Sequence, residues 1–501
     1  MKQPTVLFAS SEMYPLIKTG GLADISYSLP KALADTGADV RVILPCYQNI
    51  EEQLTNVTTI AALDNLEYSE QGCLLEGTLP ANGLKVWLVK IPQYFERPGS
   101  PYLTEHGSDH PDNCQRFTAL SRVVAQVALG RLNPAWTPDI VHCNDWQTAL
   151  VPAFLSFHDG PPVIFTIHNL AYQGVFPAEQ FHALTLPAEW WSPEKLEFHG
   201  NLCLLKAGII CADAVTTVSP TYAREILNPE YGYGLDGLLL HNKDKLTGII
   251  NGIDTRVWNP ATDPYLEFPF AHDKIREKTR NKCALQEQLG LPVDKTIPLI
   301  GVVSRLAHQK GIDLIISAIS ALSDRKVQWA ILGSGDSELE SRLQSLSKEL
   351  KHKVALSLKY DERLAHRIEA GADFFAMPSR YEPCGLNQMY SLNYGAVPIV
   401  RNTGGLADTI IDAGDGRAKA PQTANGFVFD SDQTDTFVAA LRYALKTYRN
   451  KSEYRKLQQN GMQTGFGWQS SAKKYLALYK QEIKRKRQAT KRNAQKESEL
   501  A

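Results

Sequence analysis

The chain has 501 residues, which suits two or three domains better than one hydrophobic core. Hydrophobic residues make up 43% and charged residues 21%, as in an ordinary globular protein, and the net charge of −1 gives no bulk attraction to nucleic acid or to an anionic membrane. No run reaches the ~18 apolar residues of a membrane-spanning helix, and the N-terminal residues lack the longer apolar core of a secretory signal.

The eight cysteines are scattered along the chain, and none of them forms a CxxC pair or a metal-ligand spacing. We therefore expect reduced, buried thiols and a cytoplasmic location. Neither nucleic acid nor a membrane is expected as a partner.

Short β-branched runs alternate with helical patterns along the first half of the chain. Strands are expected over residues 5–10, 39–44, 86–90, 139–143, 163–168, 214–218 and 246–250. Helices are expected over residues 21–36, 111–130, 146–158, 201–211 and 220–226. Several of these strands are apolar on both faces, which is typical of a parallel sheet covered by helices.

A polar, proline-containing stretch from about residue 258 to 298 interrupts the alternation, which then restarts. Strands are expected over residues 297–304, 327–332, 354–358, 373–377, 397–401 and 426–429. Helices are expected between them, over residues 312–322, 337–350, 362–370, 386–394 and 434–448. The sequence therefore predicts an α/β fold of two Rossmann-like domains, residues 1–255 and 256–470, with an interdomain cleft.

The C-terminal part of the chain carries two further helical patterns within residues 452–483. In the second pattern the apolar positions 472, 475, 476, 479 and 483 share one helix face. We expect a helix in residues 471–501 that packs back on the first domain. Beyond it, residues 484–496 hold seven lysines and arginines, for which a frayed, solvated helix end is favoured and an anionic partner is the alternative.

One hexapeptide, Thr-Gly-Gly-Leu-Ala-Asp, occurs at residues 19–24 and again at residues 403–408. Each copy follows an expected strand and opens a helix. Paired glycines let backbone N–H groups approach a ligand, and a helix N-terminus favours an anion. Two copies, one in each domain, favour a binding role over two ordinary glycine-containing helix starts.

Candidate site residues of the first domain follow directly after strands, because ligands of open α/β sheets bind outside the carboxyl ends of the strands. Lys18 precedes the first glycine pair and is a candidate phosphate clamp. Asp145 follows the fourth strand at a helix start, where an N-cap and a functional carboxylate are both open. His168, beside Asn169, suits hydrogen bonds to sugar hydroxyls or a structural role. The junction at residues 251–254 suits a turn and a hinge.

Candidate site residues of the second domain begin with Arg305 and Lys310, two cations that can bracket a diphosphate at a strand-to-helix turn. Tyr360 ends a later strand and can stack on a base. The densest segment is residues 378–386, where Glu382 stands at a proline-stiffened, glycine-containing helix start. The second hexapeptide follows about twenty residues later and adds backbone donors.

Some familiar signatures are missing from the sequence. It has no P-loop, and no GxGxxG fingerprint follows either first strand. The only DxD string, at residues 430–432, is interpreted as turn and cap chemistry and not as a metal site. Because Lys18, Arg305 and Lys310 already supply positive charge for a diphosphate, we expect neither a metal ion nor a cofactor.

Several segments together resemble the bacterial glycogen synthase and plant starch synthase family, in the family's order and spacing from about residue 5 to 480. They are KTGGLADI, HNLAYQG, SPTYAREI, NGID, SRLAHQKGID and SRYEPCGLNQMY followed by TGGLADT. The resemblance implies the GT-B fold. It also implies transfer of glucose from the donor ADP-glucose to the non-reducing end of an α-1,4-glucan such as glycogen, with retention at the anomeric carbon.

The functional positions of this family are carried over only where the motifs match. The resemblance implies roles in catalysis or beside the sugar for Glu382, Arg305, Lys310, His168 and Asp145. It implies donor binding by Lys18, Gly20, Gly21, Asp24, Asn251, Tyr360, Tyr381, Cys384, Gly385, Leu386, Thr403, Gly404 and Gly405. Within this set, backbone N–H groups at residues 384–386 would face the glucose, and those at residues 403 and 404 would face the phosphates.

The mechanism that the resemblance favours is front-face transfer, in which the leaving phosphate accepts the proton of the acceptor hydroxyl. Cleavage of the glucosyl–phosphate bond builds negative charge on ADP, which the cations and glycine turns would stabilise. A retaining hydrolase would instead need two carboxylates ~5 Å apart, and the sequence offers no convincing pair.

The sequence departs from the family pattern at three places. Residues 142–147 read HCNDWQ where the family usually has HxHDWH, so Asn144 and Gln147 replace two histidines. Phe95 stands where a tyrosine is usual. Tyr390 holds the position, eight residues after Glu382, at which many retaining GT-B enzymes have a second glutamate.

Two kinds of alternative function stay open from the sequence. One is another GT-B enzyme, either a UDP-glucose-dependent synthase or a glucan phosphorylase, although no motif for a pyridoxal-phosphate lysine is present. The other is a non-catalytic glucan-binding protein, which predicts the loss of Glu382, Lys18 or Arg305. All three residues are present.

Overall fold

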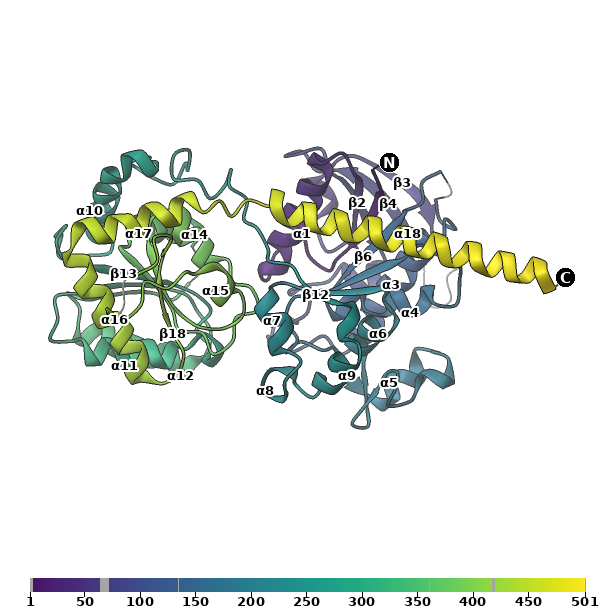
Figure 1. Ribbon diagram of the computed structural model, residues 1–501. Helices are drawn as coiled ribbons and strands as arrows, with labels where there is room; N and C mark the ends of the chain where they lie inside the picture. Colours follow the sequence, from purple (N-terminus) through teal and green to yellow (C-terminus); the bar gives the residue numbers. More distant parts are fainter. Residues whose placement is uncertain (1–2, 64–71, 134, 360, 417–419, 501) are drawn as a thin grey trace. The chain divides into compact units, whose positions relative to one another are not determined.

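The computed structural model describes residues 3–63, 72–133, 135–359, 361–416 and 420–500. The chain forms two compact units. The first domain comprises Met1–Val218, Ala223–Asn251 and Trp468–Ala501, and the second comprises Ser219–Tyr222 and Gly252–Gly467. Each domain has its own sheet covered by helices (Figure 1), so the predicted α/β architecture of two Rossmann-like domains is confirmed.

The first domain is built on a nine-stranded sheet with the order β12-β11-β7-β6-β1-β2-β5-β4-β3. The strands are β1 (Thr5–Ala9), β2 (Asp39–Pro45), β3 (Thr55–Ala62), β4 (Cys73–Thr78), β5 (Lys85–Lys90), β6 (Ile140–Asn144), β7 (Val163–Ile167), β11 (Ala214–Thr217) and β12 (Leu246–Gly248). All pairings are parallel except those of β4, which is antiparallel to β3 and β5. Because β1 lies between β2 and β6, the strand order reverses there, and ligands of such sheets bind at this point of the carboxyl edge.

The helices of the first domain include α1 (Gly21–Asp35), α3 (Asn113–Ala128) and α6 (Leu204–Cys211). After β6 the chain makes a short 3₁₀ turn, η2 (Trp146–Thr148), before α4 (Leu150–Leu155). Further elements are α2 (Pro92–Phe95), α5 (Ala178–Ala183), α8 (Pro229–Gly232), α9 (Asp236–His241) and a small antiparallel sheet of β8 (Val175–Pro177), β10 (Asn201–Cys203) and β9 (Glu197–Phe198). The helix α7 (Pro220–Glu225) spans the boundary at Tyr222 between the residues of the two domains.

The second domain has a six-stranded parallel sheet with the order β15-β14-β13-β16-β17-β18. Its strands are β13 (Leu299–Val303), β14 (Gln328–Leu332), β15 (Val354–Ser357), β16 (Phe374–Met377), β17 (Val397–Arg401) and β18 (Phe427–Phe429). Its helices are α10 (Lys278–Gln288), α11 (Ile312–Ala321), α12 (Ser337–Glu349), α13 (Glu362–Gly371), α14 (Asn387–Asn393), α15 (Gly404–Thr409), α16 (Thr434–Arg449) and α17 (Lys451–Gln463). The strand order reverses between β13 and β16, which places the loops after these two strands at the switch point.

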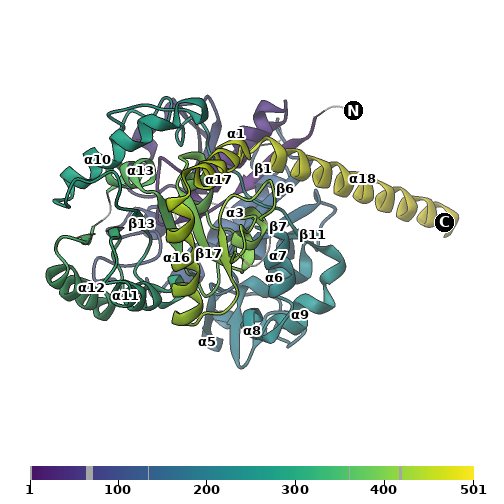
Figure 2. The ribbon, with the colours of Figure 1, turned by 60° about the vertical axis from the view of Figure 1, so that its left-hand side comes forward.

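The C-terminal helix α18 (Gln469–Leu500) packs on the first domain along its N-terminal half and extends past it (Figures 1 and 2). Tyr475 and Tyr479 are fully buried. The Tyr479 hydroxyl lies 2.6 Å from Nδ1 of His142, whose Nε2 lies 2.6 Å from the Thr166 hydroxyl. This chain of hydrogen bonds ties α18 to β6 and β7. Among the helices that the structure describes, none is long and apolar enough to cross a membrane.

Several predicted elements differ from the observed ones. The helix expected over residues 146–158 is observed as η2 followed by a short α4 that ends at Leu155, and Asp145, directly before η2, has a positive φ of 55°. Residues 201–203 form β10, so the helix expected from residue 201 begins at Leu204. Strands β3 and β4 were not expected, since β3 is largely exposed and has no apolar pattern.

The polar stretch expected between the domains also holds regular structure. It contains η5 (His272–Glu277) and α10, whose apolar residues are too few to show a helical period. At the other end of the chain, the basic segment expected to fray is continuous helix to Leu500, and residues 487–493 are exposed.

The buried hydroxyl of Tyr479 gives a testable prediction for stability. We expect Tyr479→Phe to destabilise the first domain by about 1–3 kcal/mol, because His142 Nδ1 loses its partner in a fully buried place. Tyr479→Ala should cost about 3–5 kcal/mol through the added cavity. Urea unfolding measures both, with Lys474→Ala on the exposed face of α18 as the control. Equal stability of Tyr479→Phe and the control would contradict the hydrogen-bonded role.

Candidate functional site

The carboxyl ends of β1, β6 and β7 are neighbours in the first sheet, and they bring together the loops that carry Lys18, Asp145 and His168. In the second sheet, the loops after β13, β16 and β17 carry Arg305 and Lys310, Glu382, and the second hexapeptide. Both sets therefore lie at the edge where open α/β sheets bind ligands.

The loop before α1 is organised by a buried carboxylate that the sequence analysis missed. Glu12 accepts hydrogen bonds from the Thr19 N–H at 2.6 Å, the Thr19 hydroxyl at 2.7 Å and the Gly20 N–H at 3.3 Å. The Tyr102 hydroxyl donates a fourth bond at 2.5 Å. The Glu12 side chain thus occupies the N–H group of Gly20, which was expected to face a ligand, together with that of Thr19. The signal available in the sequence was an acid seven residues before Thr19, next to the first strand.

Lys18, the predicted phosphate clamp, is exposed and lies 2.9 Å from the Asp24 carboxylate. Asp24 stands in the first turn of α1, so the two predicted donor-binding residues form an ion pair at the helix start. Gly20 and Gly21 are exposed, and a Cβ built on Gly20 would meet no atom within 4 Å. A side chain at Gly20 would therefore have open space at the start of α1.

Asp145 occupies the N-cap position of η2, but its side chain does not cap that turn. The carboxylate turns to the end of β7 and accepts the His168 N–H at 2.7 Å. Desolvation by burial raises the pKa of Asp145 from 3.8 to about 7, although N–H bonds from His168 and Asn169 oppose the shift. Its backbone, at φ 55° and ψ −177°, is in a conformation that non-glycine residues rarely adopt. Asp145 therefore holds the His168 loop and is not a helix cap.

His168 reaches across to the preceding strand, where its Nε2 lies 2.9 Å from Asn144 Oδ1. Burial lowers the pKa of His168 to about 3, so the imidazole is neutral near pH 7. Its Nδ1 is buried and has no hydrogen-bond partner among the described residues. Nδ1 of His168 is thus the ring nitrogen that could accept a hydrogen bond from a sugar hydroxyl, as predicted for this residue.

Glu382 and Lys310 form an ion pair at the switch point of the second sheet. Lys310 Nζ lies 2.6 Å from Glu382 Oε2, and the Ser379 hydroxyl donates to the same oxygen at 3.0 Å. The Glu382 side chain is 7% exposed and that of Lys310 is 20% exposed. A carboxylate this buried requires such partners. Arg305 lies on the same loop as Lys310, and its Nη2 is 3.5 Å from Gln309 Oε1.

A bidentate ion pair between Arg380 and Asp313 fixes the loop that carries Glu382. Arg380 donates to both carboxylate oxygens of Asp313, each at 2.8 Å, and this hydrogen bonding lowers the pKa of Asp313. The Arg380 N–H also donates to the Gln309 carbonyl at 2.8 Å. The Gln309 amide donates to the carbonyl of Tyr381, a predicted donor-binding residue, at 3.3 Å. The loops after β13 and β16 are therefore linked through the two residues that precede Glu382.

The second hexapeptide packs against the backbone of the Glu382 loop. Gly404 has φ 45°, and a Cβ there would lie 2.0 Å from the Glu382 carbonyl oxygen. A Cβ on Gly405 would lie 2.0 Å from the Cys384 carbonyl oxygen, and the Gly405 N–H donates to the Glu382 carbonyl at 3.0 Å. Both glycines are thus required by the close approach of two backbones. The N–H of Gly405 is used within the chain.

The remaining predicted residues are distributed as follows. Cys384 is buried, Gly385 has φ 69°, and Leu386 is the N-cap residue of α14. Thr403 is fully buried as the N-cap residue of α15. Oδ1 of Asn251 has no hydrogen-bond partner among the described residues. Tyr360 lies outside the described residues.

Three of the residues that depart from the family pattern, Asn144, Phe95 and Tyr390, make defined contacts in the structure. Asn144 contacts His168, as described above. The Arg116 guanidinium lies 5.5 Å from the ring centroid of the buried Phe95. Tyr390 stacks on Trp258 with ring centroids 3.7 Å apart, so the place of a second glutamate is occupied by aromatic packing.

The part of the chain that the structure describes holds no group of three or more His, Cys, Asp or Glu side chains arranged for a metal ion. The DxD aspartates are engaged elsewhere: Asp430 accepts from the Asn402 amide at 2.9 Å, and Asp432 lies 3.4 Å from Arg380 Nε.

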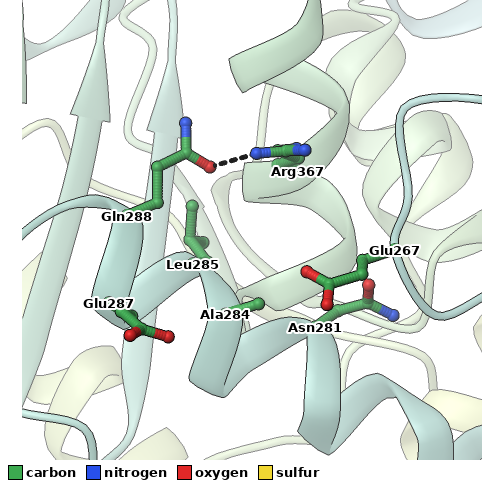
Figure 3. Close-up of a pocket in the computed structure, with 7 residues that line it drawn as sticks. All are labelled: Glu267, Asn281, Ala284, Leu285, Glu287, Gln288 and Arg367. Carbon is green, nitrogen blue, oxygen red and sulfur yellow. Dashed lines mark hydrogen bonds between the residues drawn. The ribbon is translucent and has the colours of Figure 1, made fainter.

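A pocket in the second domain lies between α10 and α13 (Figure 3). Arg367 of α13 donates to Gln288 of α10 across it at 2.7 Å. The pocket is lined by Glu267, Asn281, Ala284, Leu285, Glu287, Gln288 and Arg367. None of the predicted site residues is among them, so this pocket is separate from the candidate site.

Comparison with known proteins agrees over nearly the whole chain. Residues 5–241 match the starch synthase catalytic domain, and residues 286–464 match the glycosyl transferases of group 1. The chain is 47% identical over 477 residues to glycogen synthase 2 of Nitrosococcus oceani, covering 95% of this chain and 97% of that protein. It is 48% identical over 478 residues to the glycogen synthase of Thioalkalivibrio sulfidiphilus, covering 95% and 99%.

Among solved structures, the catalytic domain of starch synthase IV from Arabidopsis thaliana, bound to ADP and acarbose, superposes with a TM-score of 0.85. It is 35% identical and covers 96% of this chain and 100% of that one. These matches and the two Rossmann-like domains define a retaining glycosyltransferase of the GT-B fold. Within that class, the chain belongs to the glycogen synthase and starch synthase family.

The two hexapeptide copies offer a matched pair of substitutions. Gly404→Ala should destabilise the second domain by at least about 1–3 kcal/mol, since the new Cβ meets the Glu382 carbonyl and φ is positive. Gly20→Ala, at the same motif position in the first copy, has φ −155° and open space, and should change stability by no more than about 1 kcal/mol. Thermal and chemical unfolding measure both. Equal losses in the two variants would contradict the unequal packing of the copies.

The raised pKa of Asp145 predicts a pH dependence of stability. The unfolded carboxyl ionises near its ordinary pKa, but the folded one stays protonated up to about pH 7. The free energy of unfolding should therefore fall as pH rises from about 4 to about 7. In Asp145→Asn this fall should be smaller, whereas Asp159→Asn at an exposed position should keep it. Urea unfolding across this pH range tests the slope, and an unchanged slope in Asp145→Asn contradicts the assignment.

Proposed function

We propose that this chain transfers glucose from ADP-glucose to the non-reducing end of an α-1,4-glucan such as glycogen, with retention, and releases ADP. The observation that carries the proposal is the buried Glu382–Lys310 pair at the switch point of the second sheet, with Arg305 on the same loop. The pair places a negative charge beside positive ones, as a reaction needs when it separates a cationic sugar from an anionic diphosphate. A glucan-binding protein without catalysis has no need of this arrangement.

The proposed roles follow from the chemistry of each group. Arg305 and Lys310 would neutralise the charge that develops on the diphosphate as the glucosyl–phosphate bond breaks. Glu382 would lie beside the sugar, where positive charge develops. Lys18 would add a further cation for the diphosphate, and His168 would bind a sugar hydroxyl.

Front-face transfer is the mechanism that these groups support. Among the described residues, the side-chain partners of Glu382 are a lysine and a serine, and a retaining hydrolase would instead set a second carboxylic acid ~5 Å from it. We infer that the oxygen of the acceptor 4-hydroxyl attacks the anomeric carbon while the leaving phosphate oxygen takes the proton of that hydroxyl. The bond to phosphate breaks on the same face, so the configuration is retained.

The choice of ADP over UDP and the location of the enzyme complete the proposal. The starch synthase IV structure holds ADP, and its similarity to this chain supports an adenine nucleotide here. All eight cysteines are free, which supports a reducing, cytoplasmic location.

The first test incubates the protein with glycogen and either ADP-glucose or UDP-glucose, without added metal, and measures nucleotide release and glucan extension. We expect release of ADP and growth of the glucan. Faster turnover of UDP-glucose would overturn the donor assignment. Phosphate-dependent release of glucose 1-phosphate without nucleotide would favour a phosphorylase.

The second test removes the cations. Arg305→Ala and Lys310→Ala should each lower kcat by about 100- to 1000-fold, because each loses charge stabilisation in the transition state. Arg342→Ala, on the exposed face of α12, is the matched control and should keep wild-type activity. Because Lys310 also pairs with buried Glu382, circular dichroism and thermal unfolding must accompany the assay. Near-normal activity of both site variants would contradict the proposed roles.

A further inference from the structure

The side chain of Asn144 is held in one orientation at the end of β6. It is fully buried, and its Nδ2 donates to the Ala9 carbonyl at 2.8 Å. The opposite orientation would set two oxygens against each other, so Oδ1 is the atom that faces His168. Oδ1 lies 2.9 Å from Nε2 of His168. Because a carbonyl oxygen only accepts, the ring must carry its proton at Nε2.

This bond decides what the other ring nitrogen of His168 can do. Burial keeps the imidazole neutral by lowering its pKa to about 3, so the ring has one N–H group only. With that group at Nε2, Nδ1 has a lone pair and is an acceptor. Nδ1 is buried and has no partner among the described residues, which is rare for a polar atom unless a ligand supplies one.

The neighbouring polar side chains that the structure describes do not donate a hydrogen bond to Nδ1 of His168, because they are engaged with other partners. The carboxylate of Asp145 accepts the backbone N–H of His168, so it binds the loop and holds it in place. Both ring nitrogens of His142, two residues before Asn144, are engaged by the hydroxyls of Tyr479 and Thr166. This buried acceptor therefore needs an O–H or N–H donor that none of the described residues supplies.

We propose that Asn144 is a positioning residue that fixes His168 as the Nε2–H tautomer and so presents Nδ1 as the acceptor for one hydroxyl of the transferred glucose. This inference rests on the proposed function for the identity of the ligand. It also gives a use to the asparagine that stands where the family usually has histidine. An amide offers a fixed acceptor on one side and a fixed donor on the other, and it does not titrate.

The first experiment reads the tautomer directly. Nitrogen-15 NMR of the histidine-labelled protein distinguishes protonated from unprotonated ring nitrogens, and the His168→Ala variant identifies the His168 signals. We expect His168 to carry its proton at Nε2 in the wild type. A proton at Nδ1, or on both nitrogens near pH 7, overturns the inference. This measurement needs no substitution at Asn144 and no transferase activity, so its failure is distinguishable from failure of the proposed function.

The second experiment replaces Asn144 in two ways. Asn144→Leu has similar size and removes the acceptor, and Asn144→Asp is nearly isosteric but draws a proton onto the ring. In both variants the His168 signals should change while those of His142 stay, and kcat/KM for ADP-glucose should fall by about 10- to 100-fold. The loss should appear in the KM for the donor and not in the KM for glycogen. A merely structural effect would lower kcat and the unfolding temperature and leave both KM values unchanged.

The third experiment asks whether Asn144 acts through His168. In a double-mutant cycle, Asn144→Leu should cost little further kcat/KM once His168 is alanine. Nucleotide-glucose analogues that each lack one hydroxyl should show the same dependence: the wild type should discriminate against one of them, and Asn144→Leu should lose that discrimination. Additive losses, or discrimination that survives in Asn144→Leu, would overturn the inference.

Discussion

A buried carboxylate organises the loops at the carboxyl edge of the sheet in each domain. Glu12 in the first domain and Glu382 in the second are 3% and 5% exposed, and neither charge is stable there without hydrogen-bond donors around it. Glu12 gathers the N–H groups of the Thr19 loop and the Tyr102 hydroxyl, and Glu382 gathers Lys310 and Ser379. The requirement to pair these two charges fixes the loops on which the candidate residues stand.

The two copies of the hexapeptide make different contacts because their surroundings differ. In the first copy the N–H groups of Thr19 and Gly20 are already bound by Glu12, and the glycine lies in open space beside the Lys18–Asp24 pair. In the second copy Gly404 and Gly405 allow the backbone of the Glu382 loop to approach. Both copies lie at the carboxyl edge of their sheets, after β1 and β17, as the sequence predicted, but the repeat itself does not reveal the different contacts of each copy.

Much of the architecture was predictable, since buried parallel strands such as β1, β6 and β7 are continuous apolar runs. Elements without that pattern were missed: β3 is largely exposed, and α10 has few apolar residues. Candidate residues that follow strands were found because the end of each strand can be located from the sequence, and these ends form the edge of the sheet. The contributions of Glu12 and Ser379 were missed because they depend on hydrogen bonds, to the Thr19 N–H and to Glu382, that sequence spacing does not reveal. The roles assigned to the site residues in binding and catalysis remain predictions.

The sequence by itself determined the class of fold, the family, and the strand ends at which chemistry is expected, because these depend on apolar periodicity and on local motifs. Only the tertiary structure decided which hydrogen-bond partners the site side chains have. Asp145 looked equally suited to capping a helix, and its carboxylate instead holds the end of β7. His168 was a histidine of open role until the structure placed its Nε2 2.9 Å from Oδ1 of Asn144, twenty-four residues away in sequence. Hydrogen-bond direction and burial arise from residues brought together across the sheet, and for that reason no local pattern contains them.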